Sequence, residues 1–147
     1  MAATRHGRSM SDELDALRYH LGWFRMIREA RRSHPGGRAW IVRHPTEPVA
    51  VAAVLGSPLL KSSEVERYSR RLDLAPFALR LLAEDPRWAR CPAVRRNLAL
   101  NPHTPPEIAR ALLAELDDDE LRRATACHRV TRPIAEHAAE LLRVRRT

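Results

Sequence analysis

The chain has 147 residues, 44% of them hydrophobic, and it carries a formal net charge of +8 with a sequence pI near 11.0. This length and apolar content suit one domain with its own core. No apolar run approaches the roughly 20 residues of a membrane span, and residues 1–10 lack the apolar core of a secretory signal. Two distant cysteines exclude a disulfide framework and favour a reducing compartment, so we expect a cytoplasmic domain.

The positive charge comes almost entirely from arginine, because lysine occurs only at Lys61. An excess of this size favours acidic partners, which are nucleic acid, an anionic membrane surface or an acidic protein. An Arg-, Ala-, Leu- and Pro-rich composition is also typical of a high-GC genome. The sequence leaves both explanations of the charge open.

The N-terminal part predicts a disordered basic tail over residues 1–10, followed by a single domain over residues 11–144. Ser11 or Asp12 can start a long helix, which should end before His34 because a proline and two glycines follow. A stacked helical array needs an end with one polar face, and this helix is predicted to supply it. Its core-facing residues are predicted to be Leu14, Leu17, Tyr19, Leu21, Trp23 and Phe24.

The middle of the chain predicts a series of short helices. Residues 40–42 form a short apolar stretch, and residues 49–55, VAVAAVL, favour a buried helix because they are rich in alanine. The alternation in this second stretch leaves a strand open as the alternative. Further on, Ser63 and Glu66 have the spacing of a capping box. Asp73 is expected to cap a helix over residues 74–84.

The clearest signals lie in residues 94–116. An apolar helix should end before Asn101 and Pro102, because the residue before a proline is pushed out of the α region. Thr104 is expected to cap the next helix, with Pro105 at its first position and Glu107 completing a capping box. The inward face of that helix is predicted to be Ile108, Ala109, Leu112, Leu113 and Leu116.

Part of this stretch returns 27 positions later. Leu121 corresponds to Val94, Thr131 to Thr104, and Pro133 to Pro106. A fixed offset that carries a helix, a corner and a second helix indicates a stacked repeat, with its clearest units at residues 91–117 and 118–144. Between the two units, one of the aspartates at 117–119 is expected to cap the helix that follows.

Residues 94–116, VRRNLALNPHTPPEIARALLAEL, resemble one unit of the leucine-rich repeat variant family, whose units run from Val-Arg through a short helix to Asn-Pro-x-Thr-Pro and a longer helix. The resemblance implies an all-α fold, a HEAT-like α-solenoid that winds as a right-handed superhelix of alternating short and long helices. We expect about eight helices in this chain. The iron–sulfur cysteine cluster found in that family does not carry over, since only Cys91 and Cys127 are present, and no cofactor is expected. The matching residues are Val94, Arg95, Ala99, Asn101, Pro102, Thr104, Pro105 and Glu107.

Candidate metal and catalytic sites have structural explanations. Cys127 and His128 are adjacent, no pair has zinc spacing, and both cysteines are interpreted as small core residues. The acidic run 117–120 lies where a helix N-terminus attracts negative charge. Because no nucleophile elbow, phosphate loop or metalloprotease motif is present, we expect no enzymatic activity.

Arginine pairs recur at equivalent positions and form the candidate binding residues. A solenoid would align the pairs on one surface as a ladder suited to phosphates. We predict that Arg95 and Arg122 are structural, because each follows an inward residue, whereas Arg96 and Arg123 stay free to bind; Arg70 and Arg71 extend the ladder. The function expected first is recognition of a protein partner by a helical-repeat scaffold, and the alternative is binding of a nucleic-acid duplex backbone.

Overall fold

The structure is a computed structural model of the chain, and it describes residues 22, 24–43 and 48–147. This described part is all-helical and contains no strand, which confirms the all-α prediction. None of its helices is long and apolar enough to cross a membrane. The predicted tail 1–10, residues 44–47 and the core candidates Leu14, Leu17, Tyr19, Leu21 and Trp23 lie outside the described residues. Residues 24–32 are helical, and the helices that follow are α2 (Pro35–Arg43), α3 (Pro48–Leu55), α4 (Ser62–Arg70), α5 (Pro76–Glu84), α6 (Pro92–Leu100), α7 (Pro106–Leu113), α8 (Asp118–Ala126) and α9 (Arg132–Arg146).

These are nine helical segments within the described residues, one more than the expected number of about eight. The additional helix is α2, which begins where the sequence predicted only a break. The imidazole Nδ1 of His34 accepts a hydrogen bond from the Gly37 N–H at 3.1 Å, and Pro35 stands at the first helical position. A proline is favourable there because its missing N–H would be unpaired in any case. The same residues therefore end one helix and start the next.

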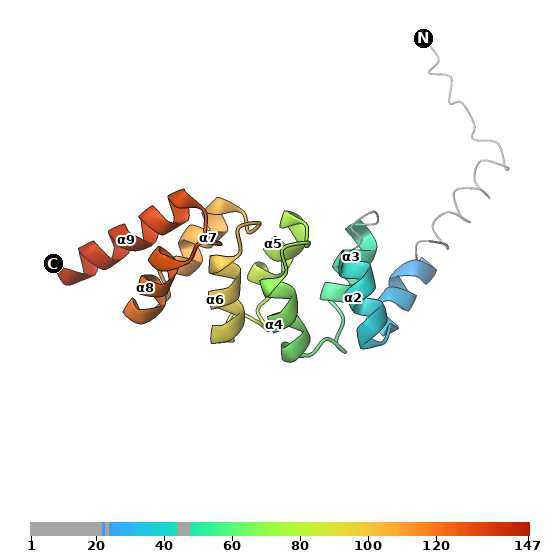
Figure 1. Cartoon of the computed structure of the whole chain (residues 1–147). Helices are drawn as coiled ribbons and strands as arrows, with labels where there is room; N and C mark the ends of the chain where they lie inside the picture. The colour runs from blue at the N-terminus through green and yellow to red at the C-terminus, as the bar shows by residue number, and fades with distance from the viewer. Residues whose placement is uncertain (1–21, 23, 44–47) are drawn as a thin grey trace, which may run out of the picture.

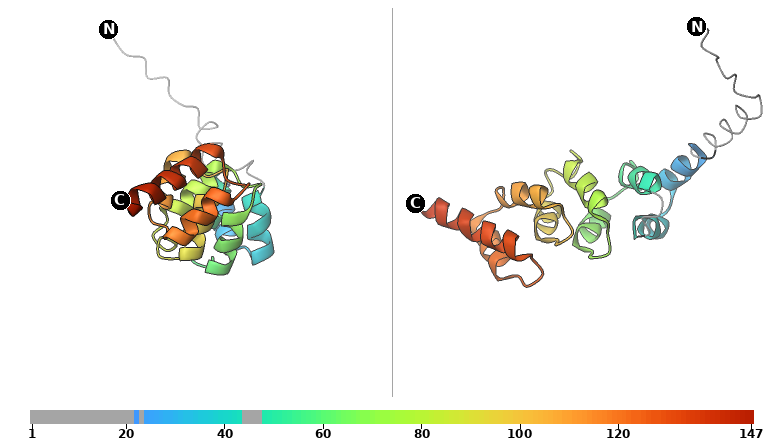
Figure 2. Two further views of the ribbon diagram at one scale, coloured as in Figure 1. Left: turned by 60° about the vertical axis from the view of Figure 1, so that its left-hand side comes forward. Right: turned by 90° about the horizontal axis from the view of Figure 1, so that it is seen from above.

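The helices lie side by side in an elongated row, with the described N-terminal helix and α9 at opposite ends (Figure 1). Seen from above, α3, α5 and α7 lie in one layer and α2, α4 and α6 in the other (Figure 2). The contacts agree with this arrangement, because α4 packs on α6 and α3 on α5, while α6 packs on α7 and α8 on α9. Each helix pair thus joins the two layers through a corner.

The core follows the row in two clusters. One cluster runs from Ala30 to Leu98 and the other from Ala99 to Leu142, and Leu112 packs against both. The stretch 49–55 is helical, as favoured from its composition, and it buries four side chains. Phe24 was predicted to be in the core, but 69% of its surface is exposed, so that prediction is wrong.

Consecutive prolines shift the predicted start of α7. Pro105 is itself the residue before a proline and is therefore held in an extended conformation, with φ −51° and ψ 133°. The first helical residue is Pro106, and Thr104 stands one position too early to cap the helix. Its buried hydroxyl has no hydrogen-bond partner among the described residues. Glu107 does not complete a capping box and instead forms an ion pair with Arg80.

Two other predicted caps are corrected in the same way, whereas a third is confirmed. Helix α5 begins at Pro76 after an extended Ala75, so the carboxylate of Asp73 is free to bind arginine instead. Helix α4 begins one residue before Ser63, and its capping carboxylate is that of Glu64. In α8 the Asp117 carboxylate accepts from the Glu120 N–H at 2.7 Å, which confirms that one of the three aspartates caps this helix. The Glu120 carboxylate accepts in return from the Asp117 N–H at 3.0 Å, so the two residues form a capping box that was not predicted.

Helix ends in one pair are capped by side chains from a later pair, an arrangement that sequence reasoning did not foresee. The last carbonyl groups of a helix have no partner inside it and need an outside donor. Four such donors lie 26–32 residues downstream of the carbonyls they reach. Ser57 caps the end of the helix 24–32, Arg87 that of α3, Asn101 that of α4 and Arg145 that of α7.

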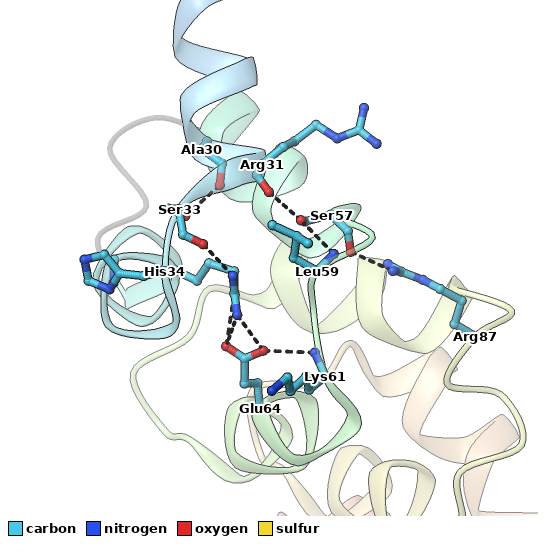
Figure 3. Close-up of polar contacts among 11 residues, drawn as sticks. Ala30, Arg31, Ser33, His34, Ser57, Leu59, Lys61, Glu64 and Arg87 are labelled. Atoms are coloured by element: carbon cyan, nitrogen blue, oxygen red, sulfur yellow. Dashed lines mark hydrogen bonds and ion pairs between the residues drawn. The ribbon is translucent and has the colours of Figure 1, made fainter.

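At the N-terminal end, a buried polar network ties several helices together (Figure 3). The guanidinium of Arg38 binds the carboxylate of Glu64 through two hydrogen bonds of 3.0 Å, and the two side chains are 4% and 3% exposed. A third donor to that carboxylate is the Lys61 N–H, at 2.9 Å, while Arg38 also donates to the Ser33 carbonyl. The ion pair links α2 to α4. Its two buried charges, on Arg38 and Glu64, are paired with each other.

Candidate functional site

Two adjoining hollows lie at the corner between α6 and α7. The larger encloses about 390 Å³ between this corner, the start of α5 and the corner between α8 and α9. Its wall is largely apolar and rich in proline, and it includes the exposed imidazole of His103 and the buried Thr104. Its other lining residues are Pro76, Ala99, Leu100, Asn101, Pro102, Pro105, Pro106, Val130, Thr131 and Ile134.

The smaller hollow, of about 190 Å³, shares Leu100, Asn101 and Pro102 with the first. We call the two hollows together the corner groove. The remaining residues of the smaller hollow are Arg70, Leu72, Asn97, Cys127 and Arg129. Leu72 is 49% exposed, which makes it one of the few large apolar side chains on the described surface.

Asn101 holds the corner in place. Its amide Nδ2 donates to the carbonyl oxygens of Ser69 at 2.9 Å and Arg71 at 2.8 Å, and its Oδ1 accepts from the His103 N–H at 3.0 Å. Both N–H donors and the oxygen of this buried amide thus bind backbone groups, and the amide joins the corner to the end of α4. The shape of the groove therefore depends on a contact between two successive helix pairs.

The charged side chains that line the corner groove are all positive. No aspartate or glutamate lines either hollow, and the lining residues Arg70 and Arg129 are exposed, without an ion pair or hydrogen bond to any described side chain. The groove therefore suits a ligand segment that combines an apolar side chain with carboxylate groups.

Of the predicted arginine ladder, only Arg70 lies in this groove. Arg71 is bound to Asp73 at 2.7 Å, a hydrogen bond that raises the pKa of Arg71 and holds the pKa of Asp73 well below its usual range. Arg96 was expected to be free, but it is partly buried and lies 3.6 Å from Glu120, so that expectation is wrong. Arg123 is exposed and has no partner among the described residues.

The two arginines predicted to be structural do hold acidic partners. The guanidinium of Arg95 lies 2.6 Å from the Glu115 carboxylate, and Arg122 pairs with Asp119 on its own helix. The structure therefore engages Arg71, Arg95, Arg96 and Arg122, so that most of the ladder is already neutralised by carboxylates.

The described side chains show little preparation for chemistry. They contain no group of three or more His, Cys, Asp or Glu residues that could hold a metal ion. The acidic residues 117–120 cap α8 and form ion pairs with Arg96, Arg122 and Arg145. Cys127 and His103 lie in different hollows of the groove.

Sequence reasoning missed several groove residues, among them Leu72, His103, Arg129 and Val130. A signal for two of them was present, because Arg129 and Val130 stand 27 positions after Pro102 and His103 in the second corner.

Comparisons of the chain with protein families, with curated proteins and with solved structures find no match. The fold class is therefore assigned from the helices alone, and the candidate site is assigned from the geometry of the corner groove.

Proposed function

We propose that the chain is a non-enzymatic α-solenoid that recognises a protein partner through the corner groove. The elongated row of helix pairs in two layers supports the solenoid reading, since each pair packs mainly on its neighbours. The observation that carries the proposal is the apolar groove at the α6–α7 corner, bordered by two unpaired arginines and by no carboxylate. A segment with an apolar residue beside aspartate or glutamate fits this surface.

A protein segment fits the groove better than a duplex does. Binding to a duplex backbone rests on many cation–phosphate contacts, and Arg71 and Arg96 are already paired with carboxylates. A protein segment can bury an apolar side chain between the prolines, which a phosphate backbone cannot do. Duplex binding is the alternative that the experiment must separate.

The test is affinity purification from native extract, with and without nuclease, using the wild-type chain and charge-reversed variants. Arg70→Glu/Arg129→Glu places two carboxylates in the groove and should abolish recovery of a stoichiometric protein partner. The matched control is Arg110→Glu/Arg146→Glu, which changes the net charge equally at exposed arginines outside the groove. It should leave recovery unchanged.

Two results would contradict the proposal. Equal loss in both double variants would show that net charge, not the groove, determines binding. Captured material that absorbs more strongly at 260 nm than at 280 nm, and that nuclease removes, would assign the surface to nucleic acid. In that case the affinity should fall steeply with added salt.

A further inference from the structure

A second groove lies at the N-terminal end of the row of helices, between the helix 24–32 and the turn that follows α3. Its volume is about 780 Å³, and we call it the N-terminal groove. Phe24, which is 69% exposed, and Leu59, which is 51% exposed, both line it, so its apolar surface is open to solvent. The other described residues in its lining are Ile27, Arg28, Arg31, Arg32 and Pro58.

The fold places apolar and cationic side chains on the same face of this helix. Met26 and Ala30 pack into the core. The groove is lined by positions 24, 27, 28, 31 and 32, which have the spacing of a single helix face. Arginine occupies three of these five positions. A partner on this face must therefore offer apolar and anionic groups together.

A hydrogen-bonded turn holds the second wall of the groove against the helix. The Ser57 hydroxyl donates to the Arg31 carbonyl at 2.6 Å and accepts from the Leu59 N–H at 3.2 Å. Figure 3 shows both contacts, and it shows the Arg31 side chain extending away from the buried network around Glu64. Leu59 is thus held beside the end of the helix before any ligand binds.

Three cations of the N-terminal groove lack a partner among the described residues. The side chains of Arg28, Arg31 and Arg32 are exposed and make no ion pair or hydrogen bond to a described residue. No aspartate or glutamate is among the described lining residues, and Glu29, the acidic residue of the helix 24–32, lies outside that lining. The groove therefore presents three guanidinium groups that no carboxylate neutralises, beside two exposed apolar side chains.

We infer that the N-terminal groove docks on an anionic phospholipid membrane. The guanidinium groups can bind lipid phosphates at the membrane surface, while their aliphatic stems and the side chains of Phe24 and Leu59 reach the acyl boundary below. The charges are complementary, because anionic leaflets attract clustered basic residues close to their surface. Binding of this kind needs no membrane-spanning helix.

A membrane fits this surface better than an acidic protein segment does. Phe24 and Leu59 are both more than half exposed, and a fluid bilayer accepts such side chains without a shaped pocket. A protein would have to place three carboxylates opposite the three arginines, whereas lipid headgroups can rearrange around each cation. This docking surface shares no residue with the corner groove and does not depend on the partner proposed for it.

The test is sedimentation of the full chain with vesicles of pure phosphatidylcholine and with vesicles that also contain phosphatidylserine, each at low and at high salt. The chain should sediment only with the phosphatidylserine vesicles. Salt should weaken this binding because it screens exposed charges. The inserted apolar side chains should retain part of it.

The contribution of the cations is tested by a double substitution. Arg28→Gln/Arg31→Gln should lower the affinity for phosphatidylserine vesicles about 25-fold, because each arginine near an anionic surface contributes about fivefold. The control Arg110→Gln/Arg146→Gln removes the same charge from exposed arginines outside both grooves and should leave the affinity nearly unchanged.

The contribution of the apolar side chains is tested separately. Phe24→Ala/Leu59→Ala should lower the affinity about tenfold or more and remove the salt-resistant part of the binding. The control Val144→Ala changes a side chain that is 59% exposed and lies outside both grooves, and it should bind like the wild type. All these positions are exposed, so thermal melting should show that every variant is folded.

The inference is overturned if the chain does not bind phosphatidylserine vesicles, or if the groove variants lose no more affinity than their controls, which would leave net charge as the cause. A third result would reassign the groove to an acidic protein. In that case the vesicles are not bound, and a protein captured from native extract is lost in Arg28→Gln/Arg31→Gln but retained in Arg110→Gln/Arg146→Gln.

Discussion

The buried ion pair between Arg38 and Glu64 gives the sharpest test of how the helix pairs are held together. Replacing Arg38 by Met keeps an unbranched side chain in the same space and removes all donors of the guanidinium. The Glu64 carboxylate, in a residue only 2% exposed, would then keep a single donor, the Lys61 N–H. A buried charge left with one hydrogen bond is strongly unfavourable.

Removing one partner of a buried ion pair typically costs about 3–5 kcal/mol. The Arg38–Glu64 pair should lie in this range, because two hydrogen bonds of 3.0 Å and one to the Ser33 carbonyl disappear together. For a domain of this size, a loss of 1 kcal/mol lowers the melting temperature by about 4 °C. Arg38→Met should therefore lower it by about 12–20 °C. The double variant Arg38→Met/Glu64→Leu leaves no buried charge and should be more stable than Arg38→Met alone.

Urea denaturation and thermal melting, both followed by circular dichroism at 222 nm, measure these effects. The matched control is Arg80→Met, which breaks another ion pair between helix pairs, to Glu107, whose side chains are 44% and 63% exposed. That variant should melt like the wild type, since exposed pairs contribute little. If Arg38→Met also melts like the wild type, or if the double variant is less stable than Arg38→Met alone, the role assigned to this pair is wrong.

The remaining predictions concern the corner, the core and the response to acid. Asn101→Ala removes three hydrogen bonds at the α6–α7 corner and should cost roughly 2–4 kcal/mol in urea denaturation. Thr104→Val removes a buried hydroxyl without a partner and should leave the melting temperature unchanged or higher, whereas a capping role would lower it. Leu113→Ala opens a cavity at a fully buried position and should cost about 2–5 kcal/mol in the same assay. The hydrogen bond from Arg87 holds the pKa of Asp85 below its usual value, so its contribution is complete above the unfolded pKa of about 3.9 and is lost as the pH falls further. The deficit of Asp85→Asn in urea denaturation should accordingly shrink below about pH 4.

Much of the secondary structure could be predicted because its signals are local. The cap of α8 depends on residues of a single turn, and Asp117, one of the three aspartates expected there, supplies it. Alanine content identified the stretch 49–55 as a helix. The same kind of reasoning failed at Thr104, because each of two consecutive prolines restricts the residue before it and the second determines where the helix starts.

The candidate site could be predicted only in part, because its character depends on residues distant in sequence. Arg70 and Arg71 are neighbours in the chain, yet one borders the corner groove and the other is bound to Asp73. The sequence alone places an arginine on a helix, but the acidic partner of Arg96 comes from the next helix pair, 24 positions later. Whether a cation is free to bind is therefore a property of the packed array.

The corner groove can form only when successive helix pairs are packed together, and side-chain caps hold these pairs to one another. Its walls come from α4, from the start of α5 and from the two corners that follow, so at least three helix pairs must be packed before it exists. The donors Ser57, Arg87, Asn101 and Arg145 each satisfy carbonyl groups 26–32 residues earlier. A helix end thus gains its side-chain donor only when a later pair has packed against it. The hydrogen bonds of Asn101 that couple neighbouring pairs also shape the groove, so the binding proposed for the corner should depend on the same contacts as the stability of the array.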